Sequence, residues 1–303
     1  MNLILGSGLI GLLAREILGP SYKIIPFGKS RFYSFNPSLA DNFIKMNKDT
    51  IEVVDKLMPS IPRLYKRPFS LSGQLLYDKQ AVIDLYLDKV HDNSVGVGNL
   101  LLDTTFMVHG VSCNALYSHL LLKYMGEIKD SISEGLSKPT RLAKDYAIFG
   151  GHKIAYDNII STIPLTVLYK LFSLSPLLDS KTVTIVKINS NNGCFDFEGA
   201  NQVLIADSMF SFYKVVEINK NQYVFFFHEE VNDYAQYISA FSENQLKVER
   251  ILEFKEYIPA DDPPDIKFLE DFNIWCVGSY AQWDDFMTVS ASIRRIFQLL
   301  GKV

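Results

Sequence analysis

The sequence predicts an α/β fold, in which a three-layer lobe with a mostly parallel sheet is joined to a second α+β lobe that contains an antiparallel sheet. Three observations predict this arrangement. Residues 2–18 form an apolar run, a glycine-rich turn and a helical pattern, in that order. Residues 146–165 form a hairpin and a buried strand, and residues 183–228 hold short β candidates between turn residues. Strand–turn–helix units are typical of parallel sheets, and closely spaced short strands are typical of antiparallel ones.

The first element is a strand at 2–5 that leads through a glycine turn into a helix at 12–18. The turn consists of Gly6, Ser7, Gly8, Leu9, Ile10 and Gly11. Its first glycine permits a tight turn, its second lets a pyrophosphate approach the backbone, and its third lets the helix pack close to the strand. The helix N-terminus presents free N–H groups and a partial positive charge to phosphates.

This order predicts a Rossmann-like dinucleotide site at the start of the chain. Two alternatives are a glycine turn without a ligand and a secretory segment. The secretory reading is disfavoured because no basic stretch precedes the apolar run and glycines interrupt it.

The second strand covers residues 22–27, and its end departs from the usual dinucleotide pattern. An acidic residue normally follows this strand and binds the ribose hydroxyls. Gly28 occupies that position here, followed by Lys29, Ser30 and Arg31. These three residues could contact a phosphate, as in sites that accept a 2′-phosphate, or they could form a solvated turn.

Strands and helices alternate through the middle of the chain. Residues 70–77 and 99–108 are rich in β-forming side chains, and we expect strands there. Residues 114–125 are apolar at helical spacing, with Asn114 as the expected N-cap. Residues 127–132 predict another strand.

The second half of the chain is dominated by β candidates. Residues 146–149 and 153–156 flank a Gly-Gly turn and predict an antiparallel hairpin. Residues 157–165 predict a buried strand that ends at a proline, and an antiparallel sheet outside the nucleotide fold is expected next. Its predicted strands are 183–189, 202–206, 210–218 and 223–228. A further strand at 273–278 and a last helix at 289–300 complete the pattern.

Composition narrows the class of function. The chain has 303 residues and a formal net charge of −4, which does not indicate nucleic-acid binding, although a modified base stays open as a substrate. No apolar run approaches the ~20 residues that span a bilayer. The three cysteines are far apart and no export signal is seen, so we expect a cytoplasmic protein. The five histidines lack metal-ligand spacing, and no metal is expected.

Three separated segments together resemble one group of flavoenzymes. The first is the glycine turn, and the second is the hairpin with residues 156–165, YDNIISTIPL. This second stretch is similar to the "G..i..D.vIsTiPl" segment of FAD-dependent amine oxidases, protoporphyrinogen oxidases and UDP-galactopyranose mutases. The third, 277–287, resembles the "vGR..qW…m" ending of the mutase branch. A weaker similarity links 210–215 to the "pFyRv" strand of that branch.

The resemblance implies two lobes and FAD as the cofactor. A Rossmann-like FAD-binding lobe would be assembled from 1–45, 110–170 and 245–303, and a substrate lobe from 46–109 and 171–244. The implied partner is a small-molecule substrate, anionic or nucleotide-linked. NAD(P) as a second cofactor stays open.

Cofactor contacts are carried over by position. The pyrophosphate would be bound by the glycine turn, through Gly6, Gly8 and Gly11. The crossover near the cofactor would be formed by Thr162, Ile163 and Pro164. The diphosphate would also be approached by Gly278 and Ser279, and the flavin pyrimidine edge would face the N–H groups of Met287, Thr288 and Val289. Trp283 is a further candidate, with core packing as its alternative.

Several residues depart from the family pattern. The ribose acid is absent at Gly28, and the arginines of "GR" and "FyRv" are Ser279 and Lys214. The chain is also short for the family. These changes remove cationic contacts that a UDP-sugar mutase would need.

The implied function is an FAD-dependent oxidoreductase that oxidises an amine or a related reduced carbon centre. Hydride transfer to flavin needs no protein nucleophile, which agrees with the absence of a triad motif. The candidate catalytic residues are Tyr213, Lys214, Tyr280 and His109. Core packing is the alternative for both tyrosines, a surface position for Lys214, and a structural role for His109. Two further alternatives are a non-redox flavoenzyme of the UDP-sugar mutase type and a nucleotide-binding protein that has lost catalysis.

Overall fold

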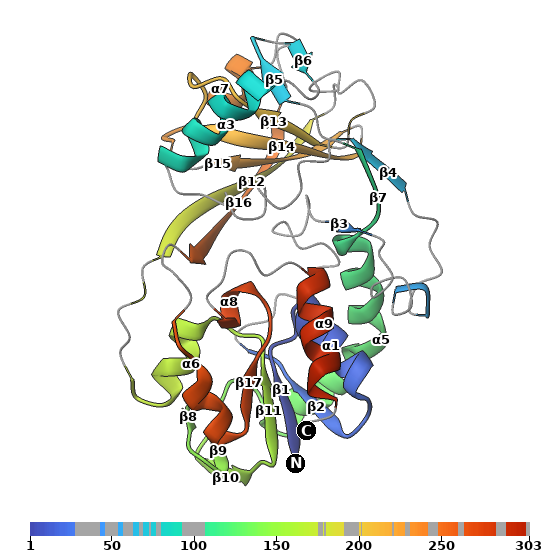
Figure 1. The fold of residues 1–303 in the computed structure, drawn as a ribbon, viewed down its shortest axis with the longest axis vertical. Helices are drawn as coiled ribbons and strands as arrows, with labels where there is room; N and C mark the ends of the chain where they lie inside the picture. The colour runs from blue at the N-terminus through green and yellow to red at the C-terminus, as the bar shows by residue number, and fades with distance from the viewer. Residues whose placement is uncertain are drawn as a thin grey trace.

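The computed structural model shows two lobes, with both chain termini in the lower one in Figure 1. The structure describes residues 1–27, 43–45, 54–56, 63–66, 69–72, 74–76, 80–92, 107–174, 178, 180–190, 200, 202–219, 221–227, 231–241, 248–259, 264–282 and 289–300.

A four-stranded parallel sheet forms the centre of the lower lobe. Its order is β17 (Ile274–Cys276), β11 (Asn158–Ser161), β1 (Asn2–Leu5) and β2 (Tyr22–Ile25). Each adjacent pair is parallel. The strands come from the beginning, middle and end of the chain, and nearly all their residues are buried because both faces of a parallel sheet are covered.

Helices and a small sheet cover the two faces of this parallel sheet. Ile4, Ile24 and Ile160 share one buried cluster with α1, α5 and α9, whereas Leu3, Leu5 and Ile159 share another with α6, α8, η2 and the small sheet. The covering elements are α1 (Leu9–Leu18), α5 (Cys113–Ser133), α6 (Leu165–Leu171), α8 (Ser279–Gln282), α9 (Val289–Leu299), η2 (Lys267–Phe272), β8 (Arg141–Leu142), β9 (Tyr146–Phe149) and β10 (His152–Ala155). The predicted three-layer lobe is therefore confirmed, as is the predicted hairpin β9–β10.

A seven-stranded sheet forms the upper lobe. Its strands, in spatial order, are β16 (Val248–Pro259), β12 (Ser180–Ser190), β15 (Gln222–Phe227), β14 (Phe212–Asn219), β13 (Gln202–Ile205), β5 (Phe69–Leu71) and β6 (Gln74–Leu76). All neighbours are antiparallel except β13 and β5. The predicted antiparallel sheet is confirmed.

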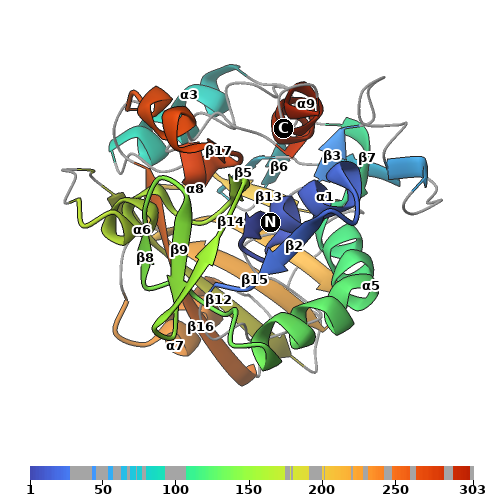
Figure 2. The ribbon, with the colours of Figure 1, turned by 90° about the horizontal axis from the view of Figure 1, so that it is seen from below.

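Two helices lie on opposite faces of the seven-stranded sheet. Val82 and Tyr86 of α3 (Gln80–Asp92) share a buried cluster with Phe226 of the sheet, whereas Ile238 of α7 (Tyr234–Phe241) shares another with Phe225. Figure 2 shows α3 on the same side of the molecule as α8 and α9, and α7 on the opposite side. A third sheet, β3 (Phe43–Lys45), β7 (Met107–Ser112) and β4 (Arg63–Lys66), lies beside the junction of the lobes.

The division of the chain into residue ranges for the two lobes stays a prediction, and the position of one strand, β16, differs from it. The range 245–303 was expected in the cofactor lobe, but β16 within it pairs along its length with β12 of the seven-stranded sheet.

Helix α5 differs from its sequence prediction at both ends. The N-cap is Ser112, whose Oγ accepts the N–H of Ala115 at 3.3 Å, and not Asn114. The helix also continues through 127–132, so the strand predicted there is wrong. Glu127 and Ser131 lie one helical turn apart and therefore share a face. That face is turned toward strand β2, a tertiary contact that local β propensity could not reveal.

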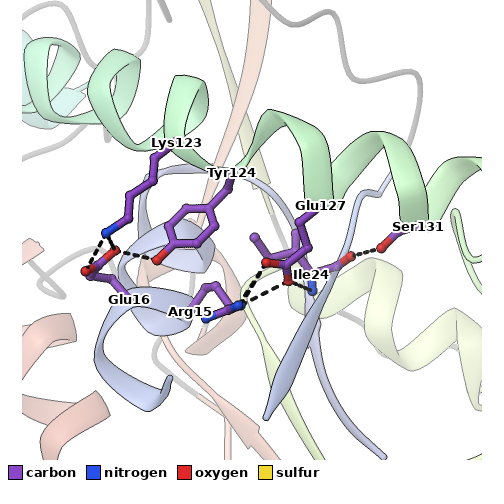
Figure 3. A network of polar contacts seen from close by, with 7 residues as sticks. All are labelled: Arg15, Glu16, Ile24, Lys123, Tyr124, Glu127 and Ser131. Atoms are coloured by element: carbon purple, nitrogen blue, oxygen red, sulfur yellow. Dashed lines mark hydrogen bonds and ion pairs between the residues drawn. The ribbon is translucent and has the colours of Figure 1, made fainter. Parts of the chain in front are cut away.

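Side chains of α5 bind the outer edge of strand β2 (Figure 3). The N–H of Ile24 donates to Oε1 of Glu127 at 3.2 Å, and Oγ of Ser131 donates to the carbonyl oxygen of Ile24 at 2.8 Å. A helix thus supplies the hydrogen bonds that a fifth strand would otherwise make, and the sheet edge is closed to further pairing.

Two further backbone groups of this edge are also occupied. The N–H of Tyr22 donates to the carbonyl of Gly19 at 3.3 Å. Pro26 has no N–H, and its carbonyl accepts from the N–H of Lys138 at 3.1 Å.

Charged side chains tie α1 to α5 around the same edge (Figure 3). Nε of Arg15 lies 3.0 Å from each carboxylate oxygen of Glu127. Glu16 accepts from Nζ of Lys123 at 2.8 and 2.7 Å and from the hydroxyl of Tyr124. Glu127 therefore pairs with a backbone donor and a cation at once.

Replacing Glu127 with Ala should lower the free energy of unfolding by about 2–4 kcal/mol, because a backbone N–H and a partly buried guanidinium lose their acceptor. The measurement is urea unfolding. Glu134→Ala is the matched control, since Glu134 pairs with Lys23 near the surface. That control should cost less than about 1 kcal/mol. Equal losses in the two variants would contradict the role of Glu127 at the edge.

The Glu16 cluster should make stability depend on pH in the acid range. Burial alone raises the pKa of Glu16, but hydrogen bonds from Lys123 and Tyr124 and the charges of Lys123 and Arg15 outweigh it, so the pKa lies below its ordinary value of 4.5. A carboxylate with a depressed pKa stabilises the folded state above its unfolded pKa, and this contribution is lost as pH falls through the folded pKa.

We expect Glu16→Gln to be less stable than the wild type at pH 7 and to approach it at pH 3. Urea unfolding of both proteins at the two pH values measures this. A stability gap that is the same at both would show that ionised Glu16 contributes nothing.

Candidate dinucleotide site

The glycine turn lies between β1 and α1, at the carboxyl end of the parallel sheet. Gly6 has φ +112°, a conformation that favours glycine, and its N–H donates to the carbonyl of Ile25 at 2.9 Å. The chain therefore turns sharply out of β1 while it stays bonded to the end of β2.

Two of the three glycines are required by close packing. A Cβ on Gly6 would lie 2.4 Å from Oγ1 of Thr162, and a Cβ on Gly11 would lie 2.1 Å from the carbonyl oxygen of Gly6. Thr162 is fixed in turn, because its Oγ1 and its N–H each donate to the carbonyl of Leu5 at 2.9 Å. Helix α1 thus packs directly against the ends of β1 and β11.

Gly8 has the opposite environment. A Cβ at Gly8 would meet nothing within 4 Å, and its φ of −72° is ordinary. Gly8 is exposed, is the N-cap of α1, and has no side chain that could cap the helix. By helix geometry, the N–H groups of Leu9, Ile10 and Gly11 have no acceptor inside α1.

Open space, free donors and the positive end of the helix dipole fit a phosphate group. No acidic residue occupies the first turn of α1 to compete for these donors. The residues present therefore fit a dinucleotide pyrophosphate.

A third segment packs against the glycine turn. Gly278 follows β17 with φ +100°, and a Cβ there would lie 3.5 Å from the Ile10 side chain. The N–H of Val277 donates to the carbonyl of Ser161 at 2.9 Å, which anchors the turn to β11. The structure thus brings together Gly6, Gly11, Thr162 and Gly278 from segments distant in sequence.

The other expected cofactor residues have mixed positions. Ile163 is buried beside Gly6, whereas Pro164 is the N-cap of α6 and Ser279 begins α8. Val289 begins α9. The remaining expected cofactor residues lie outside the described residues: Gly28, Lys29, Ser30, Arg31, Trp283, Met287 and Thr288. The backbones of His109 and Tyr280 lie in β7 and α8.

The remaining two catalytic candidates, Tyr213 and Lys214, lie together in the upper lobe on β14. Phe212 pairs with Phe227 and Lys214 pairs with Phe226, so Tyr213 is one extra residue in the strand. Nζ of Lys214 lies 4.0 Å from the ring centroid of Phe226 and 5.5 Å from that of Tyr213. Tyr213 is buried, which agrees with the alternative that it only packs in the core. It nevertheless lies on the same face of the sheet as Lys214.

Sequence reasoning did not single out Lys89, which is a buried cation on α3. One signal could have found it. Val82, Tyr86 and Lys89 follow helical spacing, so the lysine falls in the apolar stripe of that helix.

Cys276 ends β17 near the candidate site, and its thiol is poorly suited to act as a nucleophile. Its side chain is buried, and burial raises the pKa of the thiol to about 12. Within the described residues, no group of metal-ligating side chains gathers, and no helix has the length and apolar character to cross a membrane.

Comparison with known proteins gives similarity of structure without similarity of sequence. No family model matches the chain, and no curated protein matches it. An oxidoreductase from Methanosarcina mazei has a TM-score of 0.65 at 10% identity, with 99% of each chain covered. Reduced UDP-galactopyranose mutase has a TM-score of 0.61 at 11% identity, covering 99% of this chain and 94% of the other. Cyclohexylamine oxidase from Brevibacterium oxydans has a TM-score of 0.60 at 9% identity, with coverage of 99% and 97%.

These matches extend over nearly the whole length of both chains. The expectation of an amine oxidase-like and UDP-galactopyranose mutase-like fold is therefore confirmed: this chain has the two-lobed fold of these enzymes.

Proposed function

We propose that this protein binds FAD and is an oxidoreductase that oxidises an amine or a related reduced carbon centre. The observation that carries the proposal is the uncapped N-terminus of α1 at Gly8, where open space meets free backbone donors. The sequence resemblance to FAD-dependent amine oxidases and the structural similarity to cyclohexylamine oxidase and to putrescine oxidase support it.

The lower lobe would hold the cofactor through its backbone. The N–H groups of Leu9, Ile10 and Gly11 would donate to the pyrophosphate, and the positive end of α1 would favour its charge. The turn at Gly278, packed on Ile10, would close the site from the side of β17. Bound FAD would supply a ring system that accepts hydride, so the chain need not provide a nucleophile.

Tyr213 and Lys214 would serve the substrate from the upper lobe. Lys214 holds its charge against the ring of Phe226, a setting that keeps the ammonium beside apolar surface. Such a pair suits a substrate with an apolar body and an anionic group. The assignment of both residues is part of the proposal.

The decisive experiment is an absorbance spectrum of the purified protein, with mass spectrometry of any released ligand. We expect a flavin spectrum that bleaches when an amine substrate is added without oxygen. Turnover that requires prior reduction and transfers no net electrons would instead favour the mutase chemistry suggested by the similar UDP-galactopyranose mutase structure. A colourless protein that gains no spectrum with FAD would exclude both.

Gly8→Val should weaken FAD binding at least tenfold, because the added side chain would occupy the place of a phosphate. It should lower the free energy of unfolding by no more than about 1 kcal/mol, because valine is a poorer N-cap than glycine but its side chain meets only solvent. Titration calorimetry with FAD and urea unfolding measure the two effects. Gly11→Ala is the matched control, since its Cβ would overlap the Gly6 carbonyl and must destabilise the fold. Wild-type FAD affinity in Gly8→Val would contradict a pyrophosphate at this turn.

A further inference from the structure

Lys89 is a buried cation that donates to three carbonyl oxygens on one short stretch of backbone. The residue is 9% exposed. Nζ donates to the carbonyl oxygens of Ile205 at 3.0 Å, Asp207 at 2.6 Å and Phe212 at 2.9 Å. An ammonium has three N–H donors, so these three carbonyls match its donor set. Ile205 ends β13, Asp207 lies in the turn that follows, and Phe212 begins β14.

Burying this charge opposes stability. Burial lowers the pKa of Lys89 to about 8, and the nearby charge of Asp207 offsets only part of that effect. An apolar residue at a buried charged position is often neutral or stabilising. The position of Lys89 in the apolar stripe of α3 therefore indicates that the lysine fixes a backbone geometry rather than adding stability.

The backbone geometry that Lys89 fixes is the β-bulge that the extra residue Tyr213 forms in β14. A bulge of this kind interrupts the ladder of backbone hydrogen bonds and changes the direction of a side chain. The carbonyl of Phe212, directly before the extra residue Tyr213, is one of the three that Lys89 binds. Lys89 thus binds strand β14 at the point where the alternation of its side chains between the two faces of the sheet is interrupted.

The bulge places two adjacent side chains on one face of the sheet. Phe212 and Val215 belong to the cluster on the α7 side, whereas Tyr213 belongs to the cluster on the α3 side. Lys214 also lies on the α3 side, because its Nζ sits over the ring of Phe226. In a regular strand these two neighbours would point to opposite faces.

We propose that Lys89 is a positioning residue: by binding the Phe212 carbonyl it maintains the bulge that directs Tyr213 and Lys214 together toward the substrate. The last part rests on the proposed function, in which this pair contacts the substrate. The hold on the bulge does not depend on it.

A matched control exists on the other side of the same turn. The hydroxyl of Tyr237 on α7 accepts from the N–H of Ser211 at 2.6 Å and donates to the carbonyl of Met209 at 3.1 Å. Tyr237→Phe therefore loosens the turn without touching the Phe212 carbonyl. This variant measures how far a general loosening of the turn, with the Lys89 contact intact, changes the labelling of Lys214.

The test is the rate at which an amine-acylating reagent modifies Lys214, read by mass spectrometry, with exposed Lys170 as internal reference. In Lys89→Met the rate should rise about tenfold, because Lys214 leaves its stacked position when the bulge relaxes. Tyr237→Phe should stay within about twofold of the wild type, since its effect is confined to the turn. In Lys89→Gln, which keeps two donors, the labelling rate of Lys214 should lie between those of the wild type and Lys89→Met. This variant replaces Lys89→Met in the test if Lys89→Met does not fold.

The outcomes separate this inference from the proposed function. Labelling of Lys214 at the wild-type rate in the folded Lys89 variant, or a rise equal to that in Tyr237→Phe, overturns the positioning role. The labelling needs no flavin, so a protein that fails to bind FAD refutes the proposed function and leaves this test intact. Raised labelling with unchanged KM and kcat for an amine substrate overturns the part that assigns the pair to the substrate.

Discussion

At Gly6 and Gly11, the start of helix α1 lies so close to the ends of strands β1 and β11 that no side chain fits between them. A Cβ at Gly11 would overlap the Gly6 carbonyl, and one at Gly6 would overlap Thr162. This contact joins the first segment of the chain to the segment near residue 160, and Gly278 joins the third segment to Ile10. The candidate site depends on it, because only this packing leaves the open helix end at Gly8 facing solvent at the carboxyl edge of the sheet.

Helix α5 covers the lateral edge of the parallel sheet at strand β2. Glu127 and Ser131 of α5 occupy both hydrogen-bonding groups of Ile24, and Arg15 of α1 neutralises the carboxylate. An exposed edge strand invites pairing with other chains, and here side chains remove that possibility. Charge pairs of Arg15 and Glu16 with α5 also hold the second half of α1, the helix whose N-terminus is the candidate phosphate site.

The upper lobe uses a buried charge in a different way. Lys89 gathers carbonyls from two strands at the bulge that sets the directions of Tyr213 and Lys214. In both lobes, a polar side chain from a helix satisfies backbone groups that the sheet ladder leaves over. The two candidate groups, the bare helix end and the Tyr213–Lys214 pair, are thus each supported by a contact distant in sequence.

The sequence by itself determined the strand–glycine–helix unit, the hairpin and the antiparallel strands, because each rests on local conformational preferences within a few residues. It also placed Thr162 and Gly278 near the glycine turn through resemblance. Only the tertiary structure decided that 127–132 stays helical, that Tyr213 and Lys214 share a face, and that Lys89 binds the carbonyls of Ile205, Asp207 and Phe212. The partners that decide these features lie more than a hundred residues away along the chain or on a neighbouring strand, and local propensity carries no information about them.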